Sequence, residues 1–509
     1  MLWQQRQRAL KEQMGNEAGH DHSDLISKLN EILPKIAAND SSIWGPTSEA
    51  PNRLGWVDLP VTSRQLLPEL DALSAWTRSN KLDQFVLCGM GGSSLATELI
   101  AKTNNKNITI LDSTHPEQIT RSIPKDLARS LVIIASKSGT TIETLSHFKF
   151  FEKLFLDSNL EPKNHIVLIT DQGTALDSSG RKSGYRVFNA NSNVGGRFSA
   201  LTTFGLLPAS LTGTDVSILL DDAEKMSKLL VEPNSIAVQI AIAMFTRSKQ
   251  FVYFVEQQSN TPGLASWIEQ LIAESTGKDG IGRLPIVVNG LNQTNQELSI
   301  GFKDGQYDLV VKGSLGEHLI LWQWVTVLLC FLLEVDPFNQ PNVTEAKDKT
   351  SKILTDLSAG NFVHEQPRIS NKNFDLFSNL EISCVSDFLN LPCAYFSIMA
   401  FLPSSFEQEL IGVQNQLISK LNKPVTFGLG PRYLHSTGQI HKGGQSNGGF
   451  IQITQEIKTD LVIPDEQYTF GQLISAQALG DANSLTTRGV PLLRIHLKNK
   501  DCDLLEIFN

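Results

Sequence analysis

Residues 131–155, LVIIASKSGTTIETLSHFKFFEKLF, decide the fold of this chain. The apolar run Leu131–Ala135 is followed by small polar residues and then by apolar residues at helical spacing over Thr141–Phe155. This succession predicts a buried strand, a tight turn and a helix. Further apolar, β-rich runs recur between residues 80 and 215, at Phe85–Cys88, Ile108–Leu111, Ile166–Thr170 and Arg186–Asn189. Such runs, alternating with helical stretches such as Ser94–Lys102, predict an α/β domain with a doubly wound parallel sheet.

The rest of the chain divides by the same criteria. Residues 216–350 predict a second doubly wound parallel-sheet domain, with helices at 233–247, 263–273 and 315–334 and strands at 251–255, 284–288 and 308–312. Residues 351–375 are poor in apolar side chains and predict a connection. Residues 1–79 predict a helical segment, in which Pro34 should kink or end the helix near Leu33.

Residues 376–509 show a different order of elements. Strands are expected at Tyr395–Phe401, Val425–Leu429, Phe450–Thr454 and Leu492–Leu497, and helices at Phe406–Leu421 and Phe470–Leu479. The order strand, helix, strand, then again strand, helix, strand is that of a ferredoxin-like βαβ-βαβ unit. We therefore expect a C-terminal α+β domain over 376–509.

Composition excludes several classes of protein. The 509 residues include 44 Lys and Arg against 53 Asp and Glu, a net charge of −9, which disfavours a nucleic-acid or anionic-membrane binder. The apolar run 319–333 is shorter than the ~20 residues that cross a bilayer, and the N-terminus lacks the apolar core of a signal peptide. Five scattered cysteines without a CxxC pair indicate reduced thiols and a cytoplasmic protein. His20-Asp21-His22 could chelate a metal, but in a polar tail we expect it to be solvated.

The segment Ser136-Lys137-Ser138-Gly139-Thr140-Thr141 carries the strongest chemical signal. It places four hydroxyls, one ammonium and free backbone N–H groups at the positive end of a helix, which suits a phosphate monoester. The alternative is an ordinary Ser/Thr helix cap, but a cap needs only one hydroxyl. No Gly-Lys-Ser/Thr closes the loop, so it is not the ATP-binding P-loop.

A glycine turn, Cys88-Gly89-Met90-Gly91-Gly92-Ser93-Ser94, follows the first strand and opens a helix. Glycines there let the backbone approach a ligand closely, although any tight strand-to-helix turn uses them. The third glycine of the dinucleotide fingerprint is absent.

Three more segments hold candidate side chains. Arg197 lies in Val194–Ser199 (VGGRFS) and is placed to reach a cleft; a surface arginine is the alternative. Glu274 lies at a helix end in AESTGK and is a candidate base, although lone glutamates are usually solvated. Gln340 and Lys347 lie in PFNQPNVTEAK, between two helices, and could point at one pocket.

Taken in order, these five segments resemble the phosphoglucose isomerase family, which is built from two sugar-isomerase domains. The resemblance covers about residues 50–350 and is closest to the isomerase half of bifunctional transaldolase/phosphoglucose isomerase proteins, which share the Gly430–Thr454 block. The chain ahead of residue 50 is too short for a transaldolase barrel, so we expect only the isomerase half.

The resemblance implies roles for matching residues. Ser136, Ser138, Thr141 and Lys137 would grip the sugar phosphate, and Gly92 and Ser93 would line the sugar. Glu274 would move a proton between C1 and C2 through a cis-enediolate, whose negative charge Arg197 would stabilise. Gln340 and Lys347 would lie near the phosphate and the ring oxygen, with Lys347 assisting ring opening.

The histidine that opens the sugar ring in this family is not placed by its usual Gly-Gln-His segment, which the interval from 274 to 340 lacks. His318 heads the helix that runs into PFNQP and matches a later family helix better. His435 and His441 lie in a polar, glycine-containing segment between strands, and loops carry function more often than cores do. We expect one of this pair to open the ring.

The leading hypothesis is an aldose–ketose isomerase acting on glucose 6-phosphate and fructose 6-phosphate. The alternatives are a dual phosphoglucose/phosphomannose isomerase and a non-catalytic sugar-phosphate-binding regulator, which would have lost Glu274, Arg197 or Lys347. The family implies a homodimer that needs no metal and no organic cofactor. We expect a sugar phosphate as the ligand, with neither nucleic acid nor membrane as a partner.

Overall fold

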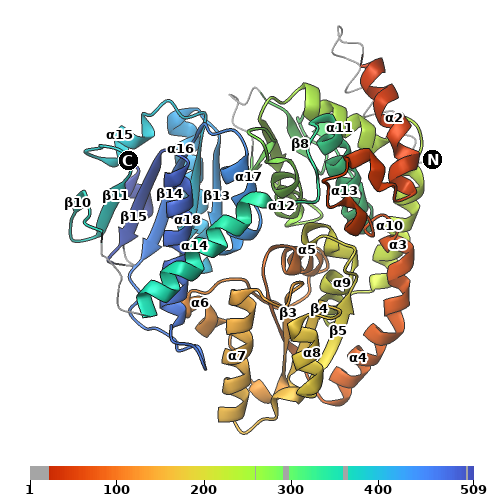
Figure 1. The fold of residues 1–509 in the computed structure, drawn as a ribbon, viewed down its shortest axis with the longest axis horizontal. Helices are drawn as coiled ribbons and strands as arrows, with labels where there is room; N and C mark the ends of the chain where they lie inside the picture. Colours follow the sequence, from red (N-terminus) through yellow and green to blue (C-terminus); the bar gives the residue numbers. More distant parts are fainter. Residues whose placement is uncertain (1–21, 258, 291–296, 359–364, 500–501) are drawn as a thin grey trace.

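The computed structural model describes residues 22–257, 259–290, 297–358, 365–499 and 502–509. Three β-sheets, each covered by helices, form the molecule (Figure 1). The N-terminal helices α2 (Ser23–Ala37), α3 (Leu59–Thr62) and α4 (Leu67–Ser79) run along one side of it. Of the two outcomes predicted for Pro34, a helix end near Leu33 was wrong, because α2 continues through Pro34 to Ala37. The missing N–H of proline removes a single helical hydrogen bond there.

The first sheet has the strand order β2-β1-β3-β4-β5, and all of its strands are parallel. The strands are β1 (Gln84–Gly89), β2 (Thr109–Leu111), β3 (Ser130–Ala135), β4 (Ile166–Asp171) and β5 (Arg186–Ala190). They alternate with α5 (Leu95–Thr103), α6 (Pro116–Arg121), α7 (Ile142–Asp157) and α8 (Ala175–Lys182). Every residue of β3 is buried, which explains its uninterrupted apolar sequence. The order reverses between β1 and β3, where open α/β sheets place their ligand crevice.

The second sheet, of order β7-β6-β8-β9, is also parallel. Its strands are β6 (Phe251–Val255), β7 (Leu284–Val288), β8 (Ser299–Gly301) and β9 (Leu309–Val310). The helices between the two sheets and around the second are α9 (Thr203–Leu211), α10 (Val216–Leu230), α11 (Ile236–Thr246), α12 (Leu264–Thr276) and α13 (Leu315–Leu332). The parallel α/β architecture predicted for this region is therefore present.

Helix α13 is long and apolar enough to cross a membrane on length and composition alone, but 89% of it is buried inside the protein. It contacts α10, α11 and α12 and carries Trp322 and Trp324, both fully buried. It therefore packs as a core helix here.

The C-terminal sheet differs from the ferredoxin-like prediction, which was wrong. Its order is β10-β11-β15-β14-β12-β13, and the four strands from β12 to β15 are parallel to one another, whereas a ferredoxin-like sheet is antiparallel. The strands are β10 (Ile369–Ser370), β11 (Phe374–Ser378), β12 (Tyr395–Phe401), β13 (Val425–Leu429), β14 (Gly448–Gln455) and β15 (Leu492–Leu497). The helices are α15 (Val385–Leu389), α16 (Glu407–Leu421), α17 (Gly438–Gly443), α18 (Phe470–Thr487) and α19 (Leu504–Ile507).

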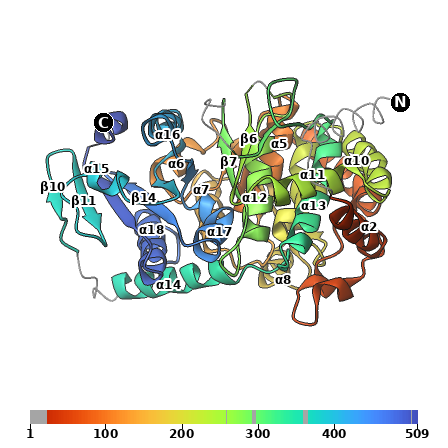
Figure 2. The ribbon, with the colours of Figure 1, turned by 90° about the horizontal axis from the view of Figure 1, so that it is seen from above.

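The error lies between β13 and β14. The sequence predicts a loop for the polar segment between them, but this segment folds into the 3₁₀ turn η9 (Arg432–His435) and helix α17. With a helical connection, β14 follows β13 by a crossover and runs parallel. The predicted connection at 351–375 also holds structure, because α14 (Pro341–Ser358) lies along α18, as Figure 2 shows.

The C-terminal sheet is packed against both of the others. One apolar core joins β6 and β7 to β12 and α17, and another joins β3 and α7 to Phe470 and Leu473 of α18. This packing holds η9 and α17 against the ends of the first two sheets. The domain boundaries at residues 80, 216 and 376 remain our proposal.

Candidate active site

The hydroxyl-rich loop predicted to bind phosphate lies between β3 and the N-terminus of α7. Ser136 is buried, and its hydroxyl donates to the Thr141 hydroxyl at 2.9 Å. Ser138 and Thr140 are exposed, and their hydroxyls lie 2.9 Å apart. Thr141 is the N-cap residue of α7, but its side chain does not cap the helix. Ser138, Thr140 and Thr141 therefore line one space at the N-terminus of α7, as an anion site requires, whereas the buried Ser136, predicted to contact the phosphate, does not line it.

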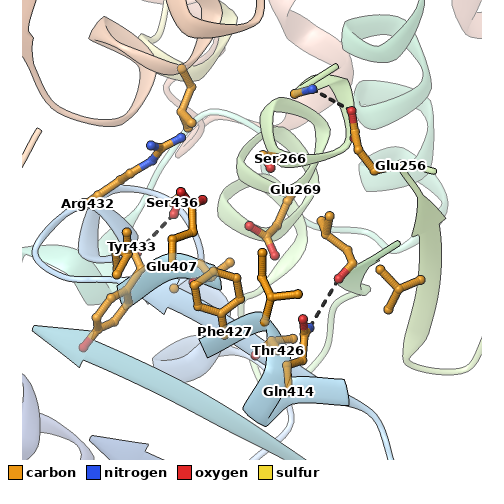
Figure 3. Close-up of a pocket in the computed structure, with 18 of the residues that line it drawn as sticks. Glu256, Ser266, Glu269, Glu407, Gln414, Thr426, Phe427, Arg432, Tyr433 and Ser436 are labelled. Atoms are coloured by element: carbon orange, nitrogen blue, oxygen red, sulfur yellow. Dashed lines mark hydrogen bonds between the residues drawn. The ribbon is translucent and has the colours of Figure 1, made fainter. Parts of the chain in front are cut away.

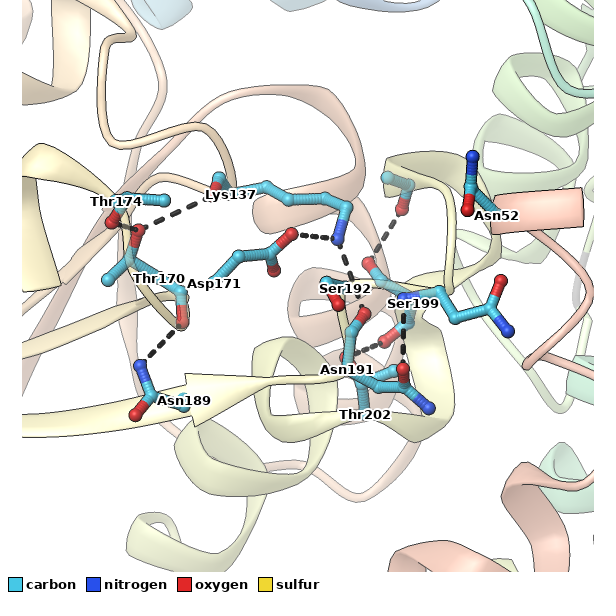
Figure 4. Close-up of polar contacts among 12 residues, drawn as sticks. Asn52, Lys137, Thr170, Asp171, Thr174, Asn189, Asn191, Ser192, Ser199 and Thr202 are labelled. Atoms are coloured by element: carbon cyan, nitrogen blue, oxygen red, sulfur yellow. Dashed lines mark hydrogen bonds and ion pairs between the residues drawn. The ribbon is translucent and has the colours of Figure 1, made fainter. Parts of the chain in front are cut away.

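Lys137 turns away from that space. Its ammonium lies 2.6 Å from the Asp171 carboxylate at the end of β4 and donates to the Asn191 carbonyl at 3.3 Å (Figure 4). Burial lowers the pKa of Lys137, which the Asp171 partner opposes. The predicted contact of Lys137 with the phosphate does not fit this geometry, because the ammonium group is already paired with Asp171.

The glycine turn after β1 brings three segments together. Gly91 has a φ of +54°, and a Cβ there would lie 2.5 Å from the His435 carbonyl oxygen. A Cβ on Gly92 would lie 2.1 Å from the Gly196 carbonyl oxygen. Ser93, in the same 3₁₀ turn η4 (Gly91–Ser93), is half-buried beside the turn η7 (Gly196–Leu201). The absence of side chains at 91 and 92 therefore lets η9 and η7 close against β1.

Arg197 and Glu274 form a buried ion pair. Arg197 Nη1 lies 3.1 Å from Glu274 Oε1, and only 2% and 8% of the two side chains are exposed. Arg197 also donates to the Ser275 hydroxyl at 2.8 Å and to the carbonyls of Pro337 and Asn339. One guanidinium thus joins three of the segments that the sequence singled out.

Gln270 connects this pair to η9. Its side-chain amide donates to Glu274 Oε2 at 3.0 Å and to the backbone carbonyl of His435 at 2.8 Å. Gln270 lies one helical turn before Glu274 on α12, so both side chains leave the same face. Gln270 is not among the residues predicted from the sequence, although its spacing from Glu274 could have indicated it.

Among the candidate histidines, His435 is the one whose ring reaches the hydroxyl-rich loop. Its Nε2 lies 3.0 Å from Glu143 Oε1 in the first turn of α7, and 15% of the imidazole side chain is exposed. The Gln477 amide of α18 also donates to Glu143 Oε1, at 2.7 Å. Glu143 was not predicted as a site residue. It lies two residues after Thr141, which ends the segment that the sequence singled out.

The other two histidines lie in the core. The ring of His441 is close to the Tyr395 and Ser397 hydroxyls, at 3.4 and 3.3 Å, and burial lowers its pKa to about 3. His318 is 1% exposed in α13, with its ring edge-on to Phe302. Of the three candidates left open by the sequence, only His435 faces the loop.

A cavity of about 160 Å³ lies between the loop and η9. The polar residues that line it are Ser138, Thr140, Thr141, Glu143, Thr350, Ser351, His435, Lys442 and Gln477. Lys442, also missed, forms a buried ion pair with Asp481 at 2.5 Å. Gln340 is exposed ahead of α14, and the side chain of Lys347 lies outside the described residues, as do His20 and Asp21.

Comparison with known proteins identifies the family. The profile described as Phosphoglucose isomerase matches residues 70–280. The glucose-6-phosphate isomerase of Mycoplasma capricolum is 30% identical over 418 residues, which cover 66% of this chain and 97% of that protein. The chain belongs to the phosphoglucose isomerase family.

Other members of the phosphoglucose isomerase family match over a smaller share of their length. The probable glucose-6-phosphate isomerase of Methanococcus maripaludis is 29% identical over 248 residues, 46% of this chain and 56% of that protein. The chain likewise spans 61% of the Methanocaldococcus jannaschii glucose-6-phosphate isomerase, at 31% identity over 249 residues.

Among solved structures, the glucose-6-phosphate isomerase of Chlamydia trachomatis shares the fold, with a TM-score of 0.52 and 18% identity over 69% of this chain and 86% of that one. The family profile spans Gly92, Ser136, Arg197 and Glu274 and ends before Lys347 and His435. His435 is therefore singled out here by its geometry alone, and Lys347 by its motif alone.

Proposed function

We propose that this chain is an aldose–ketose isomerase that interconverts glucose 6-phosphate and fructose 6-phosphate. The observation that carries the proposal is one cavity with the hydroxyl-rich loop on one side and the His435–Glu143 pair on the other. Gln270 links this cavity to the buried Arg197–Glu274 pair. Family membership and the names of the relatives point to the same reaction.

The phosphate of the substrate would lie at the N-terminus of α7. Backbone N–H groups and the hydroxyls of Ser138 and Thr141 would donate to its oxygens, and the helix dipole would add to the attraction. The contribution to the rate is positioning, because the phosphate does not react. Gln340 is proposed to lie near the phosphate and Gly92 and Ser93 near the sugar carbons, from the family pattern.

The sugar must open before it isomerises. His435 is proposed to move the proton between the ring oxygen and the C1 hydroxyl, with Lys347 assisting. Glu143 would orient the imidazole and stabilise its charged form, since its carboxylate lies 3.0 Å from Nε2. His441 lacks such a carboxylate partner, and its burial opposes protonation.

Glu274 is proposed to transfer the proton between C2 and C1. A positioned carboxylate that removes one proton and returns it to the neighbouring carbon contributes about 10²–10⁴ in rate. The enediolate that forms in between is an anion, and Arg197, held rigidly by four partners in a dry site, is the cation beside it. Removing one such donor costs about 10²–10³ in kcat.

The alternatives are weighed by the same contacts. A sugar-phosphate-binding regulator needs no base, yet Glu274 and Arg197 are both present and paired. A dual enzyme that also takes mannose 6-phosphate needs room at C2 beside the base, where Gln270 lies. Mannose 6-phosphate in the same assay distinguishes the two isomerase hypotheses.

The proposal is tested by assaying purified chain with fructose 6-phosphate and detecting glucose 6-phosphate. We expect turnover in the wild type and at least a 100-fold loss of kcat in His435→Asn. The matched variant His441→Asn, on the same segment but outside the cavity, should keep kcat within about threefold once its fold is verified. Wild-type chain that binds fructose 6-phosphate without turning it over would support the regulator instead.

Four further properties are proposed. A homodimer and the lack of a cofactor or metal requirement rest on the family resemblance, a cytoplasmic location rests on the scattered cysteines, and the lack of a nucleic-acid or membrane partner rests on the net charge of −9. Sedimentation equilibrium tests the first. The isomerase assay in excess EDTA tests the third, with unchanged kcat expected.

A further inference from the structure

A second and larger cavity, of about 400 Å³, lies on the other side of η9. Its walls come from α5, the first half of α12, the end of β7, β13 and α16 (Figure 3). It shares no lining residue with the cavity of the proposed isomerase site. Its volume lies within the range of small-molecule sites.

The charged groups that face this cavity are Glu98, Lys102, Glu256, Glu269, Glu407 and Arg432. Both cations are already paired, since Glu98 lies 2.7 Å from Lys102 and 2.5 Å from Arg432. Arg432 lies 3.3 Å from Asp112 as well. Glu256 accepts backbone N–H groups of Gly263 and Ala265, at 2.6 and 2.9 Å. The cavity therefore has an excess of carboxylates that no side-chain cation balances.

Glu269 and Glu407 are the two carboxyl groups left over, and Glu269 is the less exposed of them, being half-buried whereas Glu407 is exposed. Figure 3 shows the side chain of Glu269 pointing from α12 into the space between Ser436 and Phe427. Within the described part of the chain, no hydrogen bond or ion pair joins this carboxyl to another residue. Burial raises the pKa of Glu269 to about 8, and Arg432 only partly opposes this. A half-buried carboxyl that faces a cavity and has no donor gains from a ligand that supplies one.

The other walls select the kind of cation. Leu95, Leu99, Ile411, Phe427 and Leu429 give the cavity an apolar surface. Among the residues that the structure describes, no group of three or more His, Cys, Asp or Glu is arranged to hold a metal ion. The cavity therefore suits a ligand that carries one positive charge and an apolar part able to pack against these side chains.

We infer that this cavity binds a small organic amine, whose ammonium group pairs with Glu269 and whose hydrocarbon part packs against the apolar wall. At neutral pH the incoming ammonium displaces the proton of Glu269 to solvent, so that a neutral carboxyl becomes the carboxylate of an ion pair. The inference does not depend on the proposed isomerase activity.

Isothermal titration calorimetry with n-hexylamine tests the inference, with n-hexanol as the neutral probe of equal length. We expect hexylamine to bind at least 10-fold more tightly than hexanol. Titrations at pH 7 in two buffers of different ionisation enthalpy should show the release of close to one proton. Raising the pH from 7 to 9 should tighten hexylamine binding about 10-fold, because the ionised fraction of Glu269 rises by that factor around a pKa of about 8.

Glu269→Gln should abolish both the preference for the amine and the proton release. Glu256→Gln, in the same cavity but with its carboxylate already engaged by backbone, is the matched control and should keep the preference. Melting temperatures of both variants verify the fold. Equal affinities for hexylamine and hexanol, unchanged amine binding in Glu269→Gln, or no binding at millimolar hexylamine would each overturn the inference. Competition by fructose 6-phosphate would also overturn it, since the amine would then occupy the other cavity.

Discussion

Gly92→Ala tests how the active-site arrangement is built. The Cβ of alanine at this position would lie 2.1 Å from the carbonyl oxygen of Gly196, whereas such contacts do not fall below about 3 Å. The obstacle is backbone, so no change of rotamer relieves it. Either η4 or η7 must therefore move by about 1 Å.

The consequence falls on Arg197, because it directly follows Gly196 in η7. A shift of this size would lengthen its 3.1 Å contact with Glu274 and misplace the cation relative to the enediolate. A misplacement of 1 Å can cost about 10²-fold in rate. We expect kcat for fructose 6-phosphate to fall about 100-fold, while the affinity for the phosphate changes little, because the loop at Ser138 is not displaced.

The assay is steady-state conversion of fructose 6-phosphate, with the melting temperature as a check on folding. Gly196→Ala is the matched control, since a Cβ there meets nothing within 4 Å and its φ is not positive. It should keep kcat within about threefold. A folded Gly92→Ala variant with wild-type kcat would refute the argument that close approach at this glycine positions Arg197.

Three further predictions concern charges in and around the site. Protonation of His441 favours the unfolded chain, because burial lowers its folded pKa from 6.5 to about 3, so the stability present above pH 6.5 is lost as the pH falls. In urea unfolding, His441→Gln should lose about 2 kcal/mol less than the wild type between pH 7 and pH 5, and an equal loss would contradict this. Lys442→Met leaves Asp481 buried without its cation and should cost about 3–5 kcal/mol of unfolding free energy, part of which the added change Asp481→Asn should restore. Ser138→Ala should raise KM about 5–10-fold by removing one phosphate donor, whereas Lys137→Met should raise KM less than twofold. A larger increase of KM in Lys137→Met than in Ser138→Ala would indicate that Lys137 contacts the phosphate.

Most strands of the first two sheets follow from the sequence because they are largely apolar, whereas the short β8, Ser-Ile-Gly, was not predicted. The runs at Phe85–Cys88 and Leu131–Ala135 fall within β1 and β3, and a strand buried on both faces has few other placements. The C-terminal sheet could not be obtained in this way. Its parallel topology depends on α17, whose six residues are polar or glycine except for Ile440, so no helical period marks it.

The candidate site divides along a similar line. The motifs indicated Gly92, where only glycine leaves room for the neighbouring backbone. They also indicated Arg197, whose charge stands out directly after two glycines. They did not distinguish His435 from His441, which are six residues apart in one polar segment. Only the packing of η9 against α7 separates them, because it brings Glu143 to one ring and Tyr395 to the other.

Glu274→Gln is the most direct test of the proposed isomerase. The amide keeps the size of the side chain but cannot accept the C2 proton, so kcat should fall by at least about 10³ while binding of fructose 6-phosphate, measured by calorimetry, remains within a few-fold. Turnover of the variant at the wild-type rate would contradict Glu274 as the base and, with it, the mechanism proposed for this chain.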